Sequence, residues 1–491
     1  MCAVEYRLVE PLPNWSGPVR VRFAPNPDGA ITLGNARPAV LCEAFKRKYG
    51  GSYLLRYEDT SPSVKPPIPE AYKWILEDLN WLGIHPDEIY YQSDRLEIYY
   101  NYAKKLLELG HGYICTCDRE HFRELVKVGV PCPHRDQSPE KNLELWEKML
   151  NGEFDVGEAV FRVKTDLKHP NVSVRDWPAL RIDKAPHPRT GRRYVVWPLY
   201  NWSCAIDDHL MRITHVIRGK EHIANELRQT YLFNYFDWKP PEAIHVGRIK
   251  LEGLILSKSK IREGLQKGEY LNWDDPRLGT IRSLRRRGFH PQTIVNVLLE
   301  LGTKPVEASL DWKNIESLNR SLIDSKANRF FFVPEPIEVH IMLERDMEVN
   351  LPLHPTFRDR GYKTYKLNSG EKIFFLSSRD QRFLLNGECR LMGLFNIAPL
   401  KKVDSYFVSN PVERDVKSSK KLRIPFIQWV LKDYFIEVEV IMPDASITRG
   451  YCEKHITKFA GRGDVVQFVR FGFIKIDDVS TNLVRAFFTH R

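Results

Sequence analysis

The sequence predicts an α/β chain that begins with a parallel sheet and ends in antiparallel β structure. Three observations carry this prediction. Short apolar strands alternate with amphipathic helices over the first part of the chain. Helical periodicity largely stops after Asn328. Apolar residues make up 43% and charged residues 28% of the 491 residues. That composition indicates a globular chain with several cores and excludes a disordered or fibrous one.

The first strand–helix–strand unit is readable from Val19 to Tyr57. Val19–Ala24 is predicted as a strand, and the composition of Pro25–Gly29 is typical of a turn. A helix is expected to begin near Asn35 and to end at Gly50-Gly51. Ser52–Tyr57 is the next predicted strand. Such a unit is the building block of a parallel nucleotide-binding sheet.

The following segments are assigned in chain order. Two helices are expected next, because apolar stripes with helical spacing run through them; the stripes are Ile75, Leu79 and Leu82, then Tyr99, Tyr102, Leu106 and Leu107. Residues 112–194 are irregular, polar and proline-rich, which indicates an insertion. Strand–helix alternation resumes at Tyr194–Ile206 and His215–Arg218.

The second half of the chain is predicted to be helical and then β. Residues 262–325 have helical patterns and include the basic run Arg282–Arg287, which is typical of a solvated helix face, with phosphate contact as the alternative. Tyr434–Val440 alternates apolar and acidic residues, and Val465–Ile476 is rich in β-branched and aromatic residues. We therefore expect one or two antiparallel β-barrels at the end.

Charge and cysteine content narrow the function classes. Lys and Arg number 74 against 63 Asp and Glu, a net charge of +11, which favours a polyanionic partner such as nucleic acid. No apolar run approaches the ~18 residues that a membrane span needs, and Met1–Arg7 contains no signal-peptide core. Eight cysteines in so long a chain do not form a disulfide framework. A cytoplasmic location is expected, so clustered thiols are candidate metal ligands.

Three segments have residue types suited to nucleotide chemistry. Arg22–Arg37 places a glycine and small polar residues between a strand and a helix, where backbone N–H groups bind phosphate. Ile255–Lys260 offers lysines on a serine-flanked loop, able to close over a triphosphate. Thr214–His222 follows a buried strand and the pair Asp207-Asp208. Each has a plain structural alternative: an empty turn, a surface loop and an ion-pair network.

A fourth cluster has the donor set of a zinc site. Cys115 and Cys117 are followed after 14 residues by Cys132 and His134, so three thiols and an imidazole make a complete tetrahedral set. The alternative is a reduced cluster without metal. The other cysteines are expected to be packing or surface residues; they are Cys2, Cys42, Cys204, Cys389 and Cys452.

The order of these segments resembles a class I aminoacyl-tRNA synthetase, specifically the archaeal type of glutamyl-tRNA synthetase. Thr32–Asn35 matches the HIGH motif and Ile255–Ser259 matches the KMSKS motif. The likeness covers nearly the whole chain, and its other motifs are Arg56–Thr60, Trp197–Tyr200, Val216–His222, Trp273–Arg277, Ala327–Phe332 and Gln467–Phe473.

The resemblance implies a Rossmann-like catalytic domain with an α+β insertion, a helical stem and a C-terminal antiparallel β-barrel region that binds the anticodon. The expected domains are the first half of the catalytic domain at 1–111, the tRNA acceptor-end insertion with the zinc site at 112–194, the second half with KMSKS at 195–261, the stem at 262–325 and the anticodon-binding region at 326–491.

The implied activity is that of a glutamate–tRNA ligase. ATP, with Mg²⁺ on its phosphates, activates L-glutamate to glutamyl-adenylate, and the glutamyl group passes to the 3′-terminal adenosine of tRNA. Arg22, Glu58, Tyr200 and Arg218 match the glutamate pocket, with Arg22 on the side-chain carboxylate. Lys258 matches the lysine that stabilises the transition state, and Thr32 and Asn35 are the other expected catalytic residues. The residues implied to bind ATP are Thr32, Gly34, Asn35, Glu221, Ser257, Lys258 and Ser259.

Departures from the family pattern leave alternatives open. Thr32 and Asn35 stand where the family has histidines, and neither is ever cationic; Ile255 replaces a lysine. One alternative is therefore a non-catalytic tRNA-binding paralogue. Another is a glutaminyl-tRNA synthetase, although that family usually has Pro-Pro-Glu-Pro where this chain has Ala24–Pro27. The sequence leaves open whether tRNA(Gln) is charged besides tRNA(Glu); a monomer is the family expectation.

Overall fold

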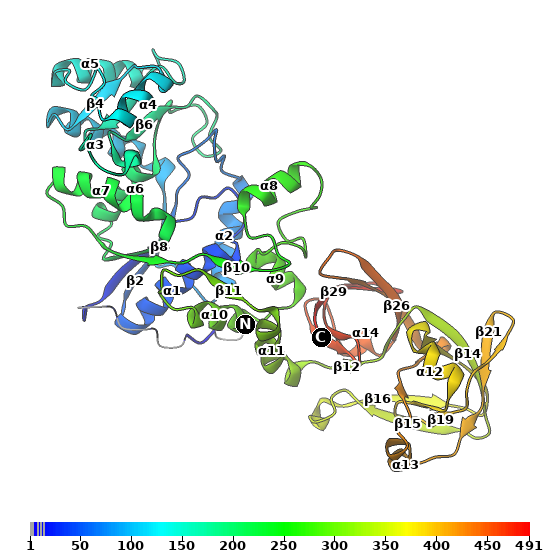
Figure 1. Ribbon diagram of the computed structural model, residues 1–491. Helices are drawn as coiled ribbons and strands as arrows, with labels where there is room; N and C mark the ends of the chain where they lie inside the picture. The colour runs from blue at the N-terminus through cyan, green and yellow to red at the C-terminus, as the bar shows by residue number, and fades with distance from the viewer. Residues whose placement is uncertain (1–3, 7–8, 10–11, 13–14) are drawn as a thin grey trace. The chain divides into compact units, whose positions relative to one another are not determined.

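Figure 1 shows the computed structural model, which describes residues 4–6, 9, 12 and 15–491. Cys2 and part of Met1–Arg7, where we predicted no signal peptide, lie outside the described residues. The chain forms two compact units: Met1–Trp273 with Ile294–Leu310, and Asp274–Thr293 with Asp311–Arg491. Among the described residues, no helix has the length and apolar character needed to cross a membrane.

The first unit is built on a five-stranded parallel sheet, which confirms the predicted α/β class. Its strand order is β3-β2-β1-β8-β9. The strands are β1 (Val19–Phe23), β2 (Gly51–Tyr57), β3 (Glu88–Tyr91), β8 (His215–Gly219) and β9 (Glu242–Val246). The helices of this part are α1 (Leu33–Tyr49), α2 (Pro69–Trp81), α3 (Leu96–Glu108), α6 (Tyr200–Leu210) and α7 (Ile223–Tyr235).

Helix α1 connects β1 to β2 much as the sequence predicts. Thr32 is its N-cap, with a hydroxyl that accepts from the backbone of Asn35. Gly50 ends the helix at φ 72°. Gly51 must be glycine, because a Cβ there would lie 1.9 Å from the carbonyl oxygen of Val19. The strand after the helix thus starts in contact with β1.

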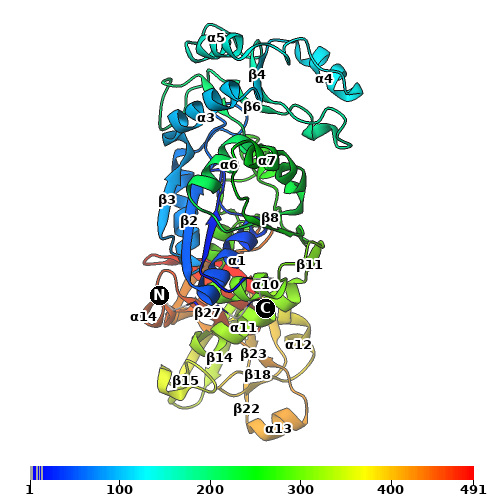
Figure 2. The same cartoon turned by 90° about the vertical axis from the view of Figure 1, so that its left-hand side faces the viewer.

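The insertion has more regular structure than its composition suggests. Strands β4 to β7 form an antiparallel sheet. Figure 2 shows helices α4 and α5 beside strand β4. Trp146, Phe161 and Trp197 supply a core that this sheet shares with α3 and α6. Large aromatic side chains outweigh the polar composition here. The bounds are β4 (Gly112–Cys115), α4 (Arg119–Val128), α5 (Pro139–Leu150), β5 (Val160–Val163), β6 (Pro178–Ile182) and β7 (Val196–Pro198).

Strand β7 therefore belongs to the insertion's sheet, although the alternation pattern placed Tyr194–Ile206 in the resumed parallel domain. The predicted helical segment 262–325 contains four helices and is divided between the two units. They are α8 (Lys258–Gln266), α9 (Ile281–Arg287), α10 (Pro291–Glu300) and α11 (Trp312–Ile323). In the first unit, β10 (Ile249–Leu251) pairs in parallel with β11 (Ala308–Leu310).

The second unit contains a seven-stranded sheet that closes on itself. Its edge strands are separated in the chain only by Phe331. Phe332, Val438 and Ile474 lie in its core. The strands, in spatial order, are β12 (Arg329–Phe330), β27 (Val465–Phe468), β28 (Gly472–Val479), β29 (Leu483–His490), β25 (Phe435–Ile441), β26 (Ile447–Glu453) and β13 (Phe332–Pro334).

Three smaller sheets surround a second core that includes Trp429 and Phe374. The first consists of β20 (Lys401–Val403), β21 (Tyr406–Ser409), β14 (Pro336–Leu343), β17 (Gly370–Ser377) and β24 (Val430–Leu431). The others are β15 (Met347–Pro352) with β16 (Tyr362–Leu367), and β22 (Pro411–Val412), β19 (Asn396–Ile397), β18 (Cys389–Leu391) and β23 (Phe426–Ile427). Most pairs are antiparallel as predicted, but the described strands of this unit include four parallel pairs.

Candidate active site and metal centre

One cavity of about 1120 Å³ opens at the carboxyl ends of β1, β2 and β8. This edge is where open parallel sheets bind their ligands. Every residue that the sequence assigned to glutamate or ATP lines this cavity. They are Arg22, Thr32, Gly34, Asn35, Glu58, Tyr200, Arg218, Glu221, Ser257, Lys258 and Ser259.

Arg22, the expected carboxylate ligand, is fixed by a buried acid. Its Nε lies 3.2 Å from Oδ1 of Asp208, and its Nη2 lies 3.4 Å from Oδ2. Nη1 of Arg56 donates to the same Asp208 at 2.7 Å. Burial by itself would raise the pKa of Asp208, but the two guanidinium groups outweigh it and lower that pKa. Two buried guanidinium groups thus share the Asp208 carboxylate, and Arg56 also lies 3.8 Å from the buried Asp207, so these cations are held by carboxylates before a substrate binds.

Glu58 lies in the same network and has a buried thiol as its hydrogen-bond donor. Sγ of Cys204 lies 2.8 Å from Oε1 of Glu58, and Nη2 of Arg56 lies 3.5 Å from that oxygen. Burial raises the pKa of Glu58, while Arg56, Arg22 and the thiol oppose that rise. Our expectation that Cys204 is only a packing or surface residue therefore misses its polar contact with the pocket.

A further wall of the cavity carries Tyr200 and Arg218. Nη1 of Arg218 donates to Gln229 at 2.9 Å, which fixes the guanidinium. The Tyr200 ring lies 5.1 Å from that of His222, centroid to centroid. Burial lowers the pKa of His222 to about 4, helped by the charge of Arg218. His222 is therefore neutral at pH 7, so Arg218 supplies the positive charge on this wall.

The N-terminus of α1 faces the cavity with its polar groups in a defined order. Thr32 is buried, and its hydroxyl donates to Oδ1 of Asn35 at 2.7 Å. Asn35 is exposed. Because its Oδ1 accepts the bond from Thr32, its amide N–H₂ remains as the donor of this side chain. A Cβ at Gly34 would meet only the Thr32 hydroxyl, at 4.0 Å, so the space above this glycine stays open. Asn35 is thus the side chain here that is best placed to donate to a phosphate, and Thr32 holds it.

Lys258 lies at the start of α8 and not in a loop as predicted, with Ser257 as the N-cap. Its ammonium donates to Oδ1 of Asp28 at 3.1 Å and to the carbonyl oxygen of Asn26 at 3.1 Å. Arg262 donates to the other oxygen of Asp28 at 2.6 Å. Burial lowers the pKa of Lys258, and Asp28 opposes the shift. The Lys258 segment is therefore bound to the loop after β1 through one carboxylate.

The loop after β1 depends on Gly29. Its φ is 154°, and a Cβ there would lie 2.0 Å from the ring of Trp273. The Trp273–Arg277 motif thus places an indole ring directly on the loop that holds Lys258. A side chain at position 29 would displace either this loop or the ring of Trp273.

Sequence reasoning missed Asp28, Arg56, Cys204 and Asp208 as site residues. One signal for Asp208 was present: Asp207 and Asp208 are adjacent acids in a helix whose other side chains are largely apolar. Buried acids need counter-ions, and Arg22 and Arg56 end adjacent parallel strands. The pairing itself is set by the fold.

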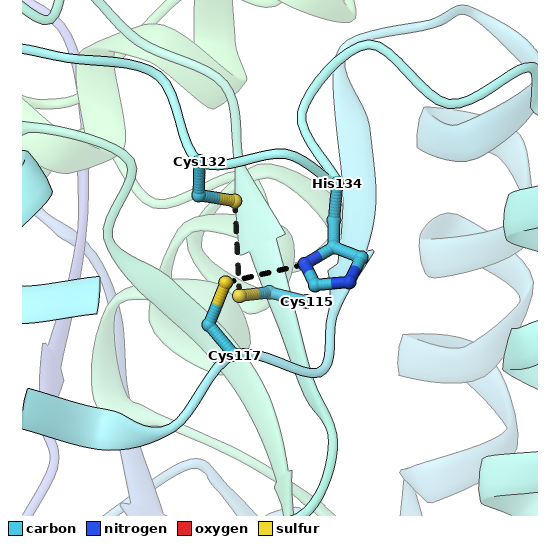
Figure 3. Close-up of side chains that lie close together, drawn as sticks. All are labelled: Cys115, Cys117, Cys132 and His134. Carbon is cyan, nitrogen blue, oxygen red and sulfur yellow. Dashed lines mark hydrogen bonds between the residues drawn. The ribbon is translucent and has the colours of Figure 1, made fainter. Parts of the chain in front are cut away.

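The four predicted zinc ligands converge in the insertion, as Figure 3 shows. Sγ of Cys115 and Sγ of Cys132 are 3.9 Å apart, and Sγ of Cys117 lies 3.3 Å from Nδ1 of His134. Tetrahedral Zn²⁺ with Zn–S of about 2.3 Å and Zn–N of about 2.0 Å needs ligand atoms about 3.5–3.8 Å apart. The Thr116 hydroxyl bonds Nε2 of His134 at 3.0 Å, which orients the ring. The residues fit a structural zinc ion.

The chain matches two family models over most of its length. The family described as tRNA synthetases class I (E and Q), catalytic domain, matches residues 18–325, and the corresponding anti-codon binding domain matches 327–426. Glutamate–tRNA ligase of Pyrococcus furiosus is 49% identical, covering 99% of this chain and 85% of that protein. The enzymes of Pyrococcus horikoshii and Methanocaldococcus jannaschii are 48% and 44% identical; they cover 97% and 98% of this chain, and 83% and 85% of their own lengths are matched.

Proposed function

Because the chain belongs to the class I tRNA synthetases for glutamate and glutamine, we propose that it is a glutamate–tRNA ligase working through the cavity of the first unit. The observation that carries this proposal is that all eleven residues which the family resemblance assigns to glutamate or ATP line one cavity at the carboxyl edge of the parallel sheet. The reaction makes glutamyl-adenylate and pyrophosphate from L-glutamate and ATP. The glutamyl group then passes to the 3′-terminal adenosine of tRNA, and AMP leaves.

In the proposed site, the substrate's side-chain carboxylate binds Arg22, which Asp208 holds in place. Glu58 accepts the substrate ammonium, and Tyr200 and Arg218 complete the glutamate pocket. The guanidinium of Arg22 forms a charge-assisted contact with the carboxylate of glutamate, and it cannot form that contact with the neutral amide of glutamine.

The nucleotide occupies the part of the cavity lined by α1, Glu221 and the start of α8. Gly34 leaves room for a phosphate, Asn35 donates to it, and Ser257 and Ser259 lie beside it. Lys258 stabilises the charge that develops on the leaving pyrophosphate. To do so, its ammonium exchanges Asp28 for phosphate oxygens. Mg²⁺ bound with ATP would neutralise part of the triphosphate charge, and positioning and electrostatics by the protein supply most of the rate.

Zinc is assigned to Cys115, Cys117, Cys132 and His134 as a structural ion. Around these ligands only a small core exists, which includes Tyr113, Phe122 and Val126. A metal ion would stabilise this part of the insertion where apolar burial is small. The tRNA acceptor end is the expected partner of the insertion.

The remaining assignments concern partners and location. The net charge of +11 is matched by tRNA, whose binding is mainly phosphate contact. We assign the anticodon to the β structure of the second unit, where the rings of Phe357 and Tyr362 are exposed and available to stack on bases. None of the described cysteines forms a disulfide, and we propose a reducing cytoplasm as the location. A monomer is proposed from the family.

The test is aminoacylation of tRNA(Glu) and tRNA(Gln) transcripts with glutamate and, in parallel, with glutamine. Pyrophosphate exchange in the presence of tRNA is measured on the same samples. We expect exchange with glutamate only, and charging of tRNA(Glu); charging of tRNA(Gln) as well would define a broader tRNA range. Exchange with glutamine alone would make the chain a glutaminyl enzyme. Silence with both amino acids, with intact tRNA binding, would make it a non-catalytic paralogue.

A further inference from the structure

A second cavity, of about 310 Å³, lies within the second unit between α9 and the β27–β28 hairpin. Its lining is almost entirely charged, unlike the mostly apolar pockets that bind drug-sized molecules. Five cations and two carboxylates, Asp274 and Asp477, leave it with a net charge of +3. We name it the basic groove, and its cations are Arg282, Arg285, Arg286, Arg462 and Lys475.

The two walls of the basic groove are rigidly joined. Nζ of Lys475 on β28 donates to the carbonyl oxygen of Arg285 at 2.8 Å. Arg287 is buried at 3% exposure and donates to the carbonyl oxygen of Thr489 at 3.1 Å, so it fixes α9 and does not face the groove. On the other side, the backbone N–H of Gly463 donates to Ile476 at 2.8 Å. The groove is therefore formed before any ligand binds.

The cations of the basic groove differ in whether a carboxylate binds them. Arg286 is held by Asp274 at 3.0 Å and by Asp477 at 3.2 Å, and its guanidinium lies over the ring of Phe487. Both carboxylates of the groove therefore bind Arg286. Among the described residues, none forms an ion pair with the guanidinium of Arg285 or of Arg462. Burial lowers the pKa of Lys475, and the positive charge of Arg285 lowers it further.

A bound anion would reduce the electrostatic repulsion among these cations, because like charges held close together repel each other until a counter-charge binds. We propose that the basic groove binds backbone phosphates of the tRNA, with Arg285 and Arg462 on opposite walls as the principal contacts. The inference deepens the proposed function, since it rests on tRNA being the substrate. Charged contacts without an apolar pocket are typical of phosphate binding that positions a nucleic acid and does not read its sequence.

The test compares the full-length chain with the double variant R285A/R462A. Binding of a tRNA(Glu) transcript is measured by filter retention over a range of salt concentrations, without ATP or glutamate. Loss of two phosphate contacts should reduce the slope of log K against log salt by about 2, and should weaken binding about 10- to 30-fold at low salt. In aminoacylation, KM for tRNA should rise by a similar factor, while kcat at saturating tRNA and KM for glutamate stay unchanged.

Two further variants serve as controls. R285K/R462K keeps both charges and should restore most of the affinity. R449A/R485A removes two arginines of the same unit that lie outside the groove, both bound to Glu439, and should change tRNA affinity less than twofold. If folded R285A/R462A binds tRNA with normal affinity and an unchanged salt slope, the proposal that the basic groove binds tRNA is wrong. If the unaltered chain binds tRNA through these arginines but forms no glutamyl-tRNA, the proposed function is wrong and the proposal that the basic groove binds tRNA is confirmed.

Discussion

The cavity of the first unit and the basic groove of the second unit both gather arginines, but they hold them differently. Arg22 and Arg56 are 4% and 0% exposed, and both are bound to Asp208. Arg285 and Arg462 lie at a surface, and no described carboxylate is bound to either guanidinium. The first site fixes its cations before the substrate arrives, and the second leaves them for the ligand to neutralise.

The difference follows from the ligands. A small carboxylate must be positioned against a reacting atom, so preorganisation is worth the cost of burying charge. A long polyanion needs many weak contacts, and each exposed cation contributes by releasing counterions from the nucleic acid. Substitutions in the cavity should therefore change stability and catalysis, whereas those in the groove should change tRNA affinity and its salt dependence.

The largest effect is expected from Asp208→Asn, which leaves two buried guanidinium groups with less negative charge. Breaking a buried pair costs about 3–5 kcal/mol of unfolding free energy. KM for glutamate should also rise about tenfold or more, because Arg22 is no longer held. Urea unfolding and aminoacylation kinetics measure the two effects. The control is Asp94→Asn, since Asp94 is 53% exposed in its pair with Arg189 and should cost less than about 1 kcal/mol.

The same pair predicts a pH dependence. The pKa of Asp208 is lowered in the folded chain, so its contribution to stability is present above its unfolded pKa of about 3.9 and is lost as pH falls through the lower folded value. The stability difference between the unaltered chain and D208N should therefore persist at neutral pH and shrink in acid. A difference that grows on acidification would contradict the ion pair.

Lys258→Ala should lower the rate of glutamyl-tRNA formation about 10²–10³-fold, because it removes a charge that acts mainly on the transition state. Stability should change less than in D208N, since Asp28 keeps Arg262 as a partner. Single-turnover kinetics with saturating ATP isolate this step. Lys260→Ala is the matched control: Lys260 is two residues away, exposed and outside the cavity, and should keep the rate within about threefold. Equal losses in both variants would remove the special role of Lys258.

Removal of zinc should have a smaller effect, confined to stability. The purified chain should contain about one zinc ion, and Cys132→Ala should contain none. Chelation should lower the melting temperature of the unaltered chain, by about 2–4 °C for each kcal/mol lost. Chelation should not change the melting temperature of the Cys132→Ala variant. Metal analysis that finds no zinc after purification without chelators would favour the reduced cluster.

Cys204→Ala should have the smallest effect. Loss of a weak thiol donor to a charged group should cost about 1 kcal/mol, or about fivefold in kcat/KM for glutamate. The thiol helps to keep the pKa of Glu58 down, so its removal raises that pKa, and the acid limb of the pH profile should move to higher pH. Cys204→Ser keeps a donor and should restore the profile. An unmoved acid limb in C204A would show that the contact with Glu58 has no catalytic consequence.

Much of the fold was predictable because it depends on local signals. The turn at Pro25–Gly29, the cap at Thr32 and the glycines after Tyr49 determine the first strand–helix–strand unit from residues close in sequence. The insertion was harder to predict. Its core contains Trp146, Phe161 and Trp197, which are scattered through a polar segment and gather only when its sheet forms. The four parallel pairs in the second unit likewise join strands distant in sequence.

The sequence by itself indicated which residues reach the cavity, through motifs that resemble those of a known family, and which residues form the zinc cluster, through their donor set. Only the tertiary structure decided how those residues are charged and held. Asp208 is 186 residues from Arg22 in the chain, and Lys258 is 230 residues from Asp28. Arg285 and Arg462 are far apart in the chain but line the same basic groove, while nearby Arg287 is buried. The energy of an electrostatic interaction depends on the distance between the charges and on their burial, and neither can be deduced from residues close in sequence.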